Sequence, residues 1–243
     1  GAPASTCGED GAAALHHFAA RGDSALLREL ISRRADVGVR DGRGATPLTR
    51  AAASGQAAVA KLLCEAGGAP VDEIAGDGRT SLVCAAEVTD KKRAEDTVKA
   101  LLQCRAVLEA PSSVSRAPSP LVAAVCAGHL AVSALLLEAG AEANAPDGRG
   151  RRALPCAAMA GKLTICQRLL RSSAAVDGRG SSGAAAQQGE GEGVTALSIA
   201  AARGDLQLAE LLLEARADTE LADERGLRPL MAAACRGHEE LCT

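Results

Sequence analysis

Hydrophobic residues recur along the chain in one local frame that repeats about every 33 residues. Seven leucines mark this frame, at spacings of 33, 34, 39, 33, 43 and 33 residues: Leu15, Leu48, Leu82, Leu121, Leu154, Leu197 and Leu230. In six frames a glycine follows the marker leucine by seven residues, and in five a second leucine follows it by fifteen. A self-similarity with this period is typical of proteins that stack one supersecondary unit many times.

Within one unit, residues 118–150, the polar and apolar positions predict two helices and a turn. Ser119 and Pro120 indicate a helix start, because serine is a common N-cap and the first helical N–H needs no partner. A short apolar stretch then ends at Gly128, the residue type that most easily closes a helix in the left-handed conformation. A second apolar run with helical spacing follows, and residues 144–150 are rich in turn-forming residues. The predicted unit is helix, tight turn, helix and protruding turn.

These residues resemble the ankyrin repeat. Its T-P-L-H-x-A element, its G-H turn and its L-L-x-x-G-A segment have counterparts in register: Thr46-Pro47-Leu48, Ser119-Pro120-Leu121, Gly128-His129, Gly237-His238 and Leu135 to Ala141. The resemblance implies an all-α solenoid of stacked antiparallel helix pairs with protruding turns. First helices are expected to begin at Ala14, Pro47, Ser81, Pro120, Ala153, Ala196 and Pro229.

The resemblance also predicts the domain organisation. Residues 1–10 are expected to be a flexible segment, and residues 11–243 an array of about seven repeats. Their approximate bounds are 11–44, 45–78, 79–117, 118–150, 151–193, 194–226 and a partial repeat at 227–243. Because the last repeat stops as its second helix begins, we expect the chain to be part of a longer protein.

The chain departs from the family pattern at several positions. The histidine that normally ties neighbouring turns together is present only as His16, so we expect the other interfaces to be weaker. Arg34 and Arg216 replace the glycine that ends the second helix, at a cost of about 1 kcal/mol each if they adopt the left-handed conformation. Two insertions break the period. The charged stretch Glu87 to Asp96 is expected to lengthen a helix–helix connection, and Ser181 to Glu192 to form an exposed loop.

Composition narrows the possible chemistry. No apolar run approaches the roughly 20 residues needed to cross a bilayer, so no membrane insertion is expected. Phe18 is the only aromatic residue, which argues against binding of single-stranded nucleic acid. None of the nine cysteines forms a C-x-x-C pair, and they stand where other repeats have small apolar residues. We expect reduced, mostly buried cysteines without metal, in a reducing compartment such as the cytoplasm or nucleus.

Several short motifs are better explained by the repeat than by a special function. The tripeptides Arg21-Gly22-Asp23 and Arg203-Gly204-Asp205 look like an integrin-binding sequence, but both fall on the turn between two helices. Ser119-Pro120 and Thr46-Pro47 occupy a helix N-cap, which explains them without phosphorylation. Gly161 to Thr164 resembles the end of a phosphate-binding loop but lacks its upstream glycine. With no catalytic or cofactor-binding set in the sequence, we expect no enzyme, no cofactor and no small-molecule substrate.

By the resemblance, partners bind on the concave face that the turn tips and first helices form. The candidate partner-binding residues are Arg43, Arg79, Arg149, Arg151, Met159, Arg203, Arg225 and Arg236. Arginine suits carboxylates, so the expected partner is a protein or an acidic peptide segment. Arg149 and Arg151 are expected at the centre, and reversing both charges should weaken binding with little effect on stability.

The sequence alone is compatible with more than one role for these arginines and for the chain. These arginines could instead serve only to keep an alanine-rich protein soluble. The chain could be a non-catalytic interaction scaffold, or the regulatory or targeting array of a larger enzyme or channel.

Overall fold

A computed structural model describes residues 14–109, 118–180 and 193–242. These residues form α-helices and one 3-10 helix, and a single antiparallel β-bridge joins Gly180 to Val194. No helix in the described ranges is long and apolar enough to cross a membrane. The chain divides into two units, residues 1–139 and 140–243.

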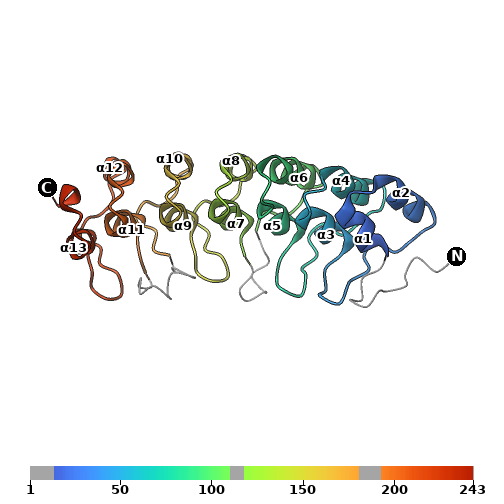
Figure 1. Cartoon of the computed structure of the whole chain (residues 1–243), viewed down its shortest axis with the longest axis horizontal. Coiled ribbons are helices and arrows are strands. Elements are labelled where there is room, and N and C mark those ends of the chain that lie inside the picture. The colour runs from blue at the N-terminus through green and yellow to red at the C-terminus, as the bar shows by residue number, and fades with distance from the viewer. Residues whose placement is uncertain (1–13, 110–117, 181–192, 243) are drawn as a thin grey trace. The chain divides into compact units, whose positions relative to one another are not determined.

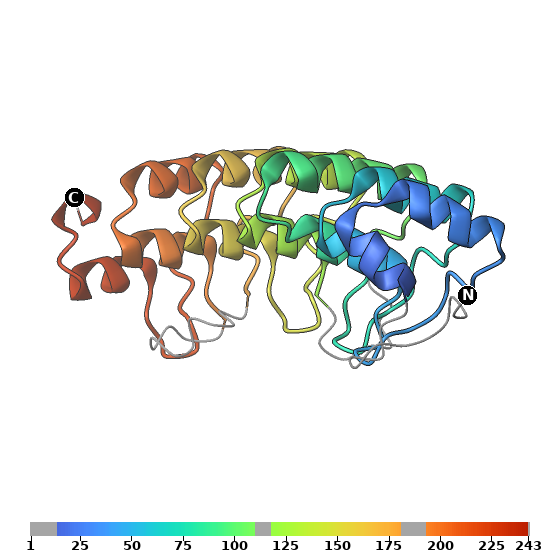
Figure 2. The same ribbon diagram turned by 45° about the vertical axis from the view of Figure 1, so that its right-hand side comes forward.

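In the first unit the helices form two layers, and the long turns project from the side of the first layer (Figures 1 and 2). The first layer contains α1 (Ala14–Arg21), α3 (Pro47–Ala53), α5 (Ser81–Ala86) and α7 (Pro120–Cys126). The second layer contains α2 (Ser24–Ser32), α4 (Ala57–Glu65), α6 (Lys91–Gln103) and α8 (Leu130–Glu138). Each helix of the first layer is followed in the chain by its partner in the second.

The second unit has the same two-layer organisation. Its first layer contains α9 (Ala153–Met159), α11 (Ala196–Arg203) and α13 (Pro229–Cys235). Its second layer contains α10 (Leu163–Arg171) and α12 (Leu206–Glu214), and the 3-10 helix η2 (Glu239–Leu241) follows α13.

All seven first-layer helices begin at the residues that the sequence predicts. Thr46, Thr80 and Thr195 explain three of these starts, because each hydroxyl accepts a hydrogen bond from a backbone N–H in the first turn. Ser119 occupies the predicted N-cap position of α7, but its side chain makes no capping hydrogen bond. There the helix start depends on Pro120, whose ring fixes a helical φ.

The marker leucines form most of the core. The first six are almost completely buried, as are the second-helix leucines at the predicted spacing, Leu63, Leu136, Leu169 and Leu212. Two leucines of the frame differ from the others. Leu230 is 57% exposed, because in the described part of the chain only α11 and η2 pack extensively on α13. Leu30 is half-buried, and Leu27, one turn earlier in α2, takes the fully buried position.

The charged insertion lengthens the connection to four residues, against two or three between the other paired helices, but it mainly extends the second helix, so that prediction is right only in part. Residues 87–90 connect α5 to α6, and α6 runs for 13 residues where the other second helices have nine. The Asp90 carboxylate caps this helix by accepting the N–H groups of Lys92 and Arg93. Among the charged residues of α6 lies an apolar stripe at helical spacing, in which Ala94, Val98 and Leu101 are fully buried.

Arg34 and Arg216 both adopt the left-handed conformation, as expected for residues that replace a helix-closing glycine. Their φ angles are 60° and 64°. Arg105 and Ser173 end their own second helices in the same way, each with φ of 61°. Four helices therefore end in a conformation that costs a non-glycine residue about 1 kcal/mol.

The prediction that the cysteines are mostly buried is wrong. The eight described cysteines are all free thiols, and only Cys84, Cys156 and Cys166 are buried. Cys126, Cys235 and Cys242 are exposed. Burial raises the pKa of the Cys84 and Cys166 thiols to about 12, so both stay protonated and poorly nucleophilic at neutral pH. No group of metal-ligating side chains occurs among the described residues.

Two predictions fall on residues outside the described ranges. They concern the N-terminal segment, residues 1–10, and the loop from Ser181 to Glu192.

Candidate partner-binding surface

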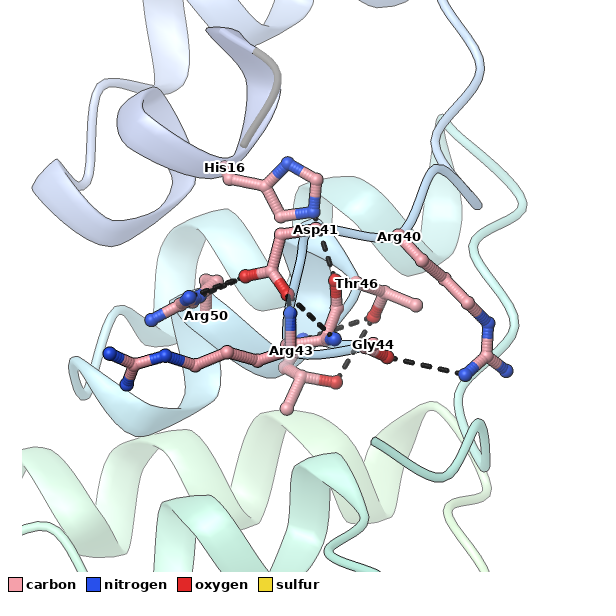
Figure 3. A network of polar contacts seen from close by, with 9 residues as sticks. His16, Arg40, Asp41, Arg43, Gly44, Thr46 and Arg50 are labelled. Atoms are coloured by element: carbon pink, nitrogen blue, oxygen red, sulfur yellow. Dashed lines mark hydrogen bonds and ion pairs between the residues drawn. The ribbon is translucent and has the colours of Figure 1, made fainter. Parts of the chain in front are cut away.

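The turn of residues 41–45, which leads into α3, is held by the side chain of Asp41. The backbone closes the turn, with Asp41 N–H donating to the Ala45 carbonyl at 3.0 Å and Gly44 N–H to the Asp41 carbonyl at 2.8 Å. One carboxylate oxygen, Oδ1 of Asp41, accepts the N–H groups of Arg43 and Ala45, both at 2.9 Å. Gly44 takes a φ of 72°, which favours glycine (Figure 3).

The same arrangement recurs at two other turns. Asp147 Oδ1 accepts the N–H groups of Arg149 and Arg151 at 2.9 and 2.8 Å. Asp223 Oδ1 accepts those of Arg225 and Leu227, both at 2.9 Å. We call residues 41–45, 147–151 and 223–227 the aspartate-locked tips.

Each aspartate-locked tip presents one arginine to solvent. Arg43, Arg149 and Arg225 stand two residues after the aspartate, and all three are exposed. Their guanidinium groups form no hydrogen bond or ion pair with another described residue. Because the backbone of each turn is fixed by the aspartate, these guanidinium groups extend from a rigid base.

Two further predicted arginines lie on turns but are already paired. Arg79 forms ion pairs with Glu87 at 2.7 Å and with Asp77 at 3.5 Å. Arg151 donates from Nε and Nη2 to Asp147 Oδ2 at 2.8 and 2.7 Å, and the Asp147 carboxylate is completely buried. Reversing the charge of Arg151 would break this buried pair, so the prediction of an unchanged stability does not fit the structure.

The remaining predicted residues lie at the ends of first-layer helices. Arg203, the last residue of α11, donates from Nη1 to the backbone carbonyl of Met159 at 2.8 Å. Met159 is the half-buried last residue of α9, so this contact joins two neighbouring repeats of the second unit. Arg236 follows α13 and is exposed.

Asp41 also binds Arg50, a residue of α3 that sequence reasoning did not select. Arg50 Nε donates to Asp41 Oδ2 at 2.7 Å, and Nη2 of the same guanidinium pairs with that oxygen. Burial acts to raise the pKa of Asp41. The hydrogen bonds from Arg50 and from the N–H groups of Ala45 and Arg43 outweigh it, so the pKa lies below its usual value. Asp41 is therefore a carboxylate at neutral pH.

An open cleft lies between the turn of residues 41–45 and the next turn, residues 75–79. It has a volume of about 800 Å³. Its lining comes from the two turns, from α3 and from α5, and includes Arg43, Arg50, Arg79 and Asp77. Of these, the sequence analysis selected Arg43 and Arg79 for partner binding.

The aspartates were missed although the sequence contains a signal for them. Asp-Gly-Arg-Gly occurs at residues 41–44, 147–150 and 177–180, and Asp-Glu-Arg-Gly at 223–226. In Asp41, Asp147 and Asp223, but not in Asp177, the aspartate stands seven residues before a marker leucine. A short acidic residue ahead of a glycine turn is a common way to satisfy backbone N–H groups, and that spacing could have identified all three.

His16 confirms the role that the resemblance gives to this histidine. Its Nε2 lies 3.0 Å from the carbonyl oxygen of Ala45, so it joins α1 to the tip of the next repeat (Figure 3). At the corresponding place in the next repeat, the Thr49 hydroxyl lies 3.3 Å from that of Ser81.

Comparison with known proteins identifies the family. The family model for ankyrin repeats matches three times, at residues 15–112, 91–179 and 180–243. The ankyrin repeat domain of human ASB11 is similar in structure, with a TM-score of 0.76 and 23% identity over 96% of this chain and 98% of that one. The ankyrin repeat domain of Bcl-3, described as a unique member of the IkappaB protein family, has a TM-score of 0.72 and 27% identity over 97% and 100%. The chain belongs to the ankyrin repeat family.

Proposed function

We propose that this chain is a non-catalytic protein-interaction scaffold that binds an acidic segment of a partner on the face formed by the turn tips and first helices. Ankyrin repeats are generally protein–protein interaction modules, and the proposal adds the face and the chemistry of the partner. The observation that supports it most is the set of three exposed guanidinium groups on aspartate-locked tips, at Arg43, Arg149 and Arg225. Arginine's planar fork binds carboxylates in pairs of hydrogen bonds.

The fixed turns matter for affinity. A flexible surface arginine loses side-chain and backbone freedom when it binds, which offsets part of the gain. In the aspartate-locked tips the backbone is already ordered, so only the side chain has to be immobilised. The other predicted residues, Arg79 in the first unit and Arg151, Met159, Arg203 and Arg236 in the second, are included in the proposed surface.

A charge-reversal experiment tests the proposal. The triple variant Arg43→Glu, Arg149→Glu and Arg225→Glu should bind an array of acidic peptides at least tenfold more weakly than wild type, because each position loses a charge-assisted contact. Binding by the wild type should also fall as salt is raised, since the Debye length shrinks from ~10 Å at 0.1 M to ~3 Å at 1 M.

A matched control keeps the net charge equal. Arg28, Lys91 and Arg171 are exposed residues of the second-layer helices α2, α6 and α10. Reversing all three changes the charge by the same amount on the other layer. If the affinity of this control for acidic peptides falls as much as that of the tip variant, the arginines act through net charge and solubility alone, and the proposal fails.

The same proposal places the chain in a reducing compartment, the cytoplasm or nucleus. Its support is that the eight described cysteines are free thiols and that three are exposed to oxidation. Thiol titration of protein isolated under acid quench should find the exposed Cys126, Cys235 and Cys242 reduced. Recovery of these cysteines as disulfides would contradict the assignment.

A further inference from the structure

The two turns that border the cleft are in direct backbone contact. Gly76 N–H donates to the Arg43 carbonyl at 3.0 Å. A Cβ atom on Gly44 would stand 2.9 Å from the Gly76 nitrogen, and one on Gly76 would stand 2.6 Å from the Arg43 oxygen. Both distances are too short for real atoms, so only glycine allows the turns to approach this closely.

Other side chains hold the same turn in place. Arg40 donates from Nη1 to the carbonyls of Ile74 at 2.9 Å and Gly44 at 3.2 Å, and its Nη2 pairs with Glu73. His16 contacts the Ala45 carbonyl from α1. The turn of residues 41–45 is therefore fixed by its own aspartate, by the preceding repeat and by the following turn.

Two guanidinium groups reach into this cleft from the fixed turn and from α3. Arg43 and Arg50 both line the cleft, and Figure 3 shows their side chains extending to the same side of the turn, away from Arg40. Arg50 uses Nε and Nη2 to bind Asp41, which leaves the donors of Nη1 without a partner among the described residues. Arg43 has all its side-chain donors available.

We propose that Arg43 and Arg50 together bind one carboxylate of a protein segment, with Asp41 acting as the group that positions Arg50. This inference deepens the proposed function, on which it rests, by assigning one binding subsite and its ligand. The small residues Gly42, Ala53, Ala75 and Gly76 line the same cleft and leave room for the backbone of an extended segment.

The charges of the cleft favour a carboxylate over a phosphate group. Arg43, Arg50 and Arg79 are balanced by three acids, since Asp41 binds Arg50 while Asp77 and Glu87 bind Arg79. A ligand with a single negative charge needs only the available donors of Arg43 and Arg50. A phosphate dianion would add a second negative charge near Asp77 and Glu87, where no further cation is free to neutralise it.

An NMR titration of the full chain tests the subsite with three blocked tripeptides: Gly-Glu-Gly, Gly-Gln-Gly and Gly-phosphoSer-Gly. The glutamate peptide should cause saturable shifts of the Arg43 Nε–H and of the Gly42, Gly44 and Gly76 amides. The glutamine peptide should cause none, and the phosphoserine peptide should bind no more tightly than the glutamate peptide. Tighter binding of phosphoserine would overturn the assigned ligand.

Paired variants separate this subsite from a general effect of tip arginines. Arg43→Gln should weaken binding of the glutamate peptide about tenfold, as expected for loss of a charge-assisted contact. Arg225→Gln, on an aspartate-locked tip outside the cleft, should leave the shifts at Gly44 and Gly76 unchanged. Equal affinity in wild type and Arg43→Gln would overturn the subsite.

The peptide-array result distinguishes failure here from failure of the proposed function. If the triple tip variant loses acidic partners while no saturable shift appears at Arg43, only the subsite is wrong. If Arg43 binds the glutamate peptide while the array retains its partners in the triple variant, the proposed function is wrong and the subsite stands.

Discussion

The turns of residues 41–45 and 75–79 adopt the same backbone with different side chains. In the second turn Ala75 stands where the first has Asp41, yet Ala75 N–H still donates to the Arg79 carbonyl at 2.9 Å and Gly78 N–H to the Ala75 carbonyl at 2.9 Å. Gly78 has a φ of 83°, close to the 72° of Gly44. In the absence of an equivalent aspartate, Asp77 Oδ1 accepts only the Arg79 N–H, at 3.1 Å.

The comparison separates two roles within one turn. The glycine and the two backbone hydrogen bonds are sufficient to define its shape, because both turns have them. The aspartate adds a layer of charge-assisted hydrogen bonds that fixes Arg50 and leaves Arg43 free to bind. A repeat can thus keep its turn while gaining or losing a binding side chain.

Removing the aspartate side chain should destabilise the protein much more in the first turn than in the second. Asp41→Ala removes two hydrogen bonds to backbone N–H groups and leaves Arg50 without its partner, so we expect a loss of about 3 kcal/mol in the free energy of unfolding. Asp77→Ala, which removes an exposed carboxylate, should cost less than about 1 kcal/mol. Urea denaturation of the full chain measures both, and equal losses would contradict the difference between the turns.

Replacing the glycine tests the contact between the turns. Gly44→Ala adds left-handed strain and a clash with Gly76, and we expect a loss of about 2 kcal/mol. The matched variant is Gly226→Ala, at the same position of another aspartate-locked tip, with φ of 77° and no atom within 4 Å of the added Cβ. Strain alone should cost it about 1 kcal/mol. A loss at Gly44 no larger than at Gly226 would show that the two turns separate easily.

The pH dependence of stability should report on Asp41. Because folding lowers its pKa, the carboxylate contributes stability that is fully present above its unfolded pKa of about 3.9 and is lost as pH falls through the folded value. The stability difference between wild type and Asp41→Asn should therefore shrink below about pH 4. Denaturation at several pH values measures this difference. In an Arg50→Met background the shrinkage should be smaller, and an identical profile would contradict the role of Arg50.

The smallest expected effect is the reverse substitution. Ala75→Asp places a carboxylate where it can accept the N–H groups of Asp77 and Arg79, with a gain of about 0.5 kcal/mol, because Asp77 already satisfies one of them. Hydrogen exchange at the amides of residues 77 and 79 should slow. Faster exchange would mean that the second turn cannot accommodate an aspartate at position 75.

The sequence predicted the helix starts well because they depend on local chemistry. Ahead of five of the seven marker leucines a threonine or proline acts within one turn of helix, so Pro47 and Ser81 begin helices wherever the rest of the repeat lies. The left-handed arginines were predictable for the same reason, because glycine commonly ends this helix in the left-handed conformation and a residue that replaces it has to adopt the same backbone.

The failures concern properties that depend on neighbouring repeats. The buried stripe of Ala94, Val98 and Leu101 was not recognised because the neighbouring residues in the sequence are charged. The spacing of the repeats does not show which face of α6 packs against α4. Cys126 and Cys235 occupy apolar positions but are exposed, because burial depends on what packs against the helix end.

The left-handed helix ends are positions at which single substitutions could raise the stability of this protein. Gly140, two residues after the end of α8, shows that glycine fits this position, whereas Arg34, Arg105, Ser173 and Arg216 hold it at a cost. Since the energy of a repeat protein is nearly the sum over its units and their interfaces, relief at each position would add to the others. Homologues from warmer environments could therefore gain melting temperature by four single exchanges that leave the turn tips and their arginines untouched.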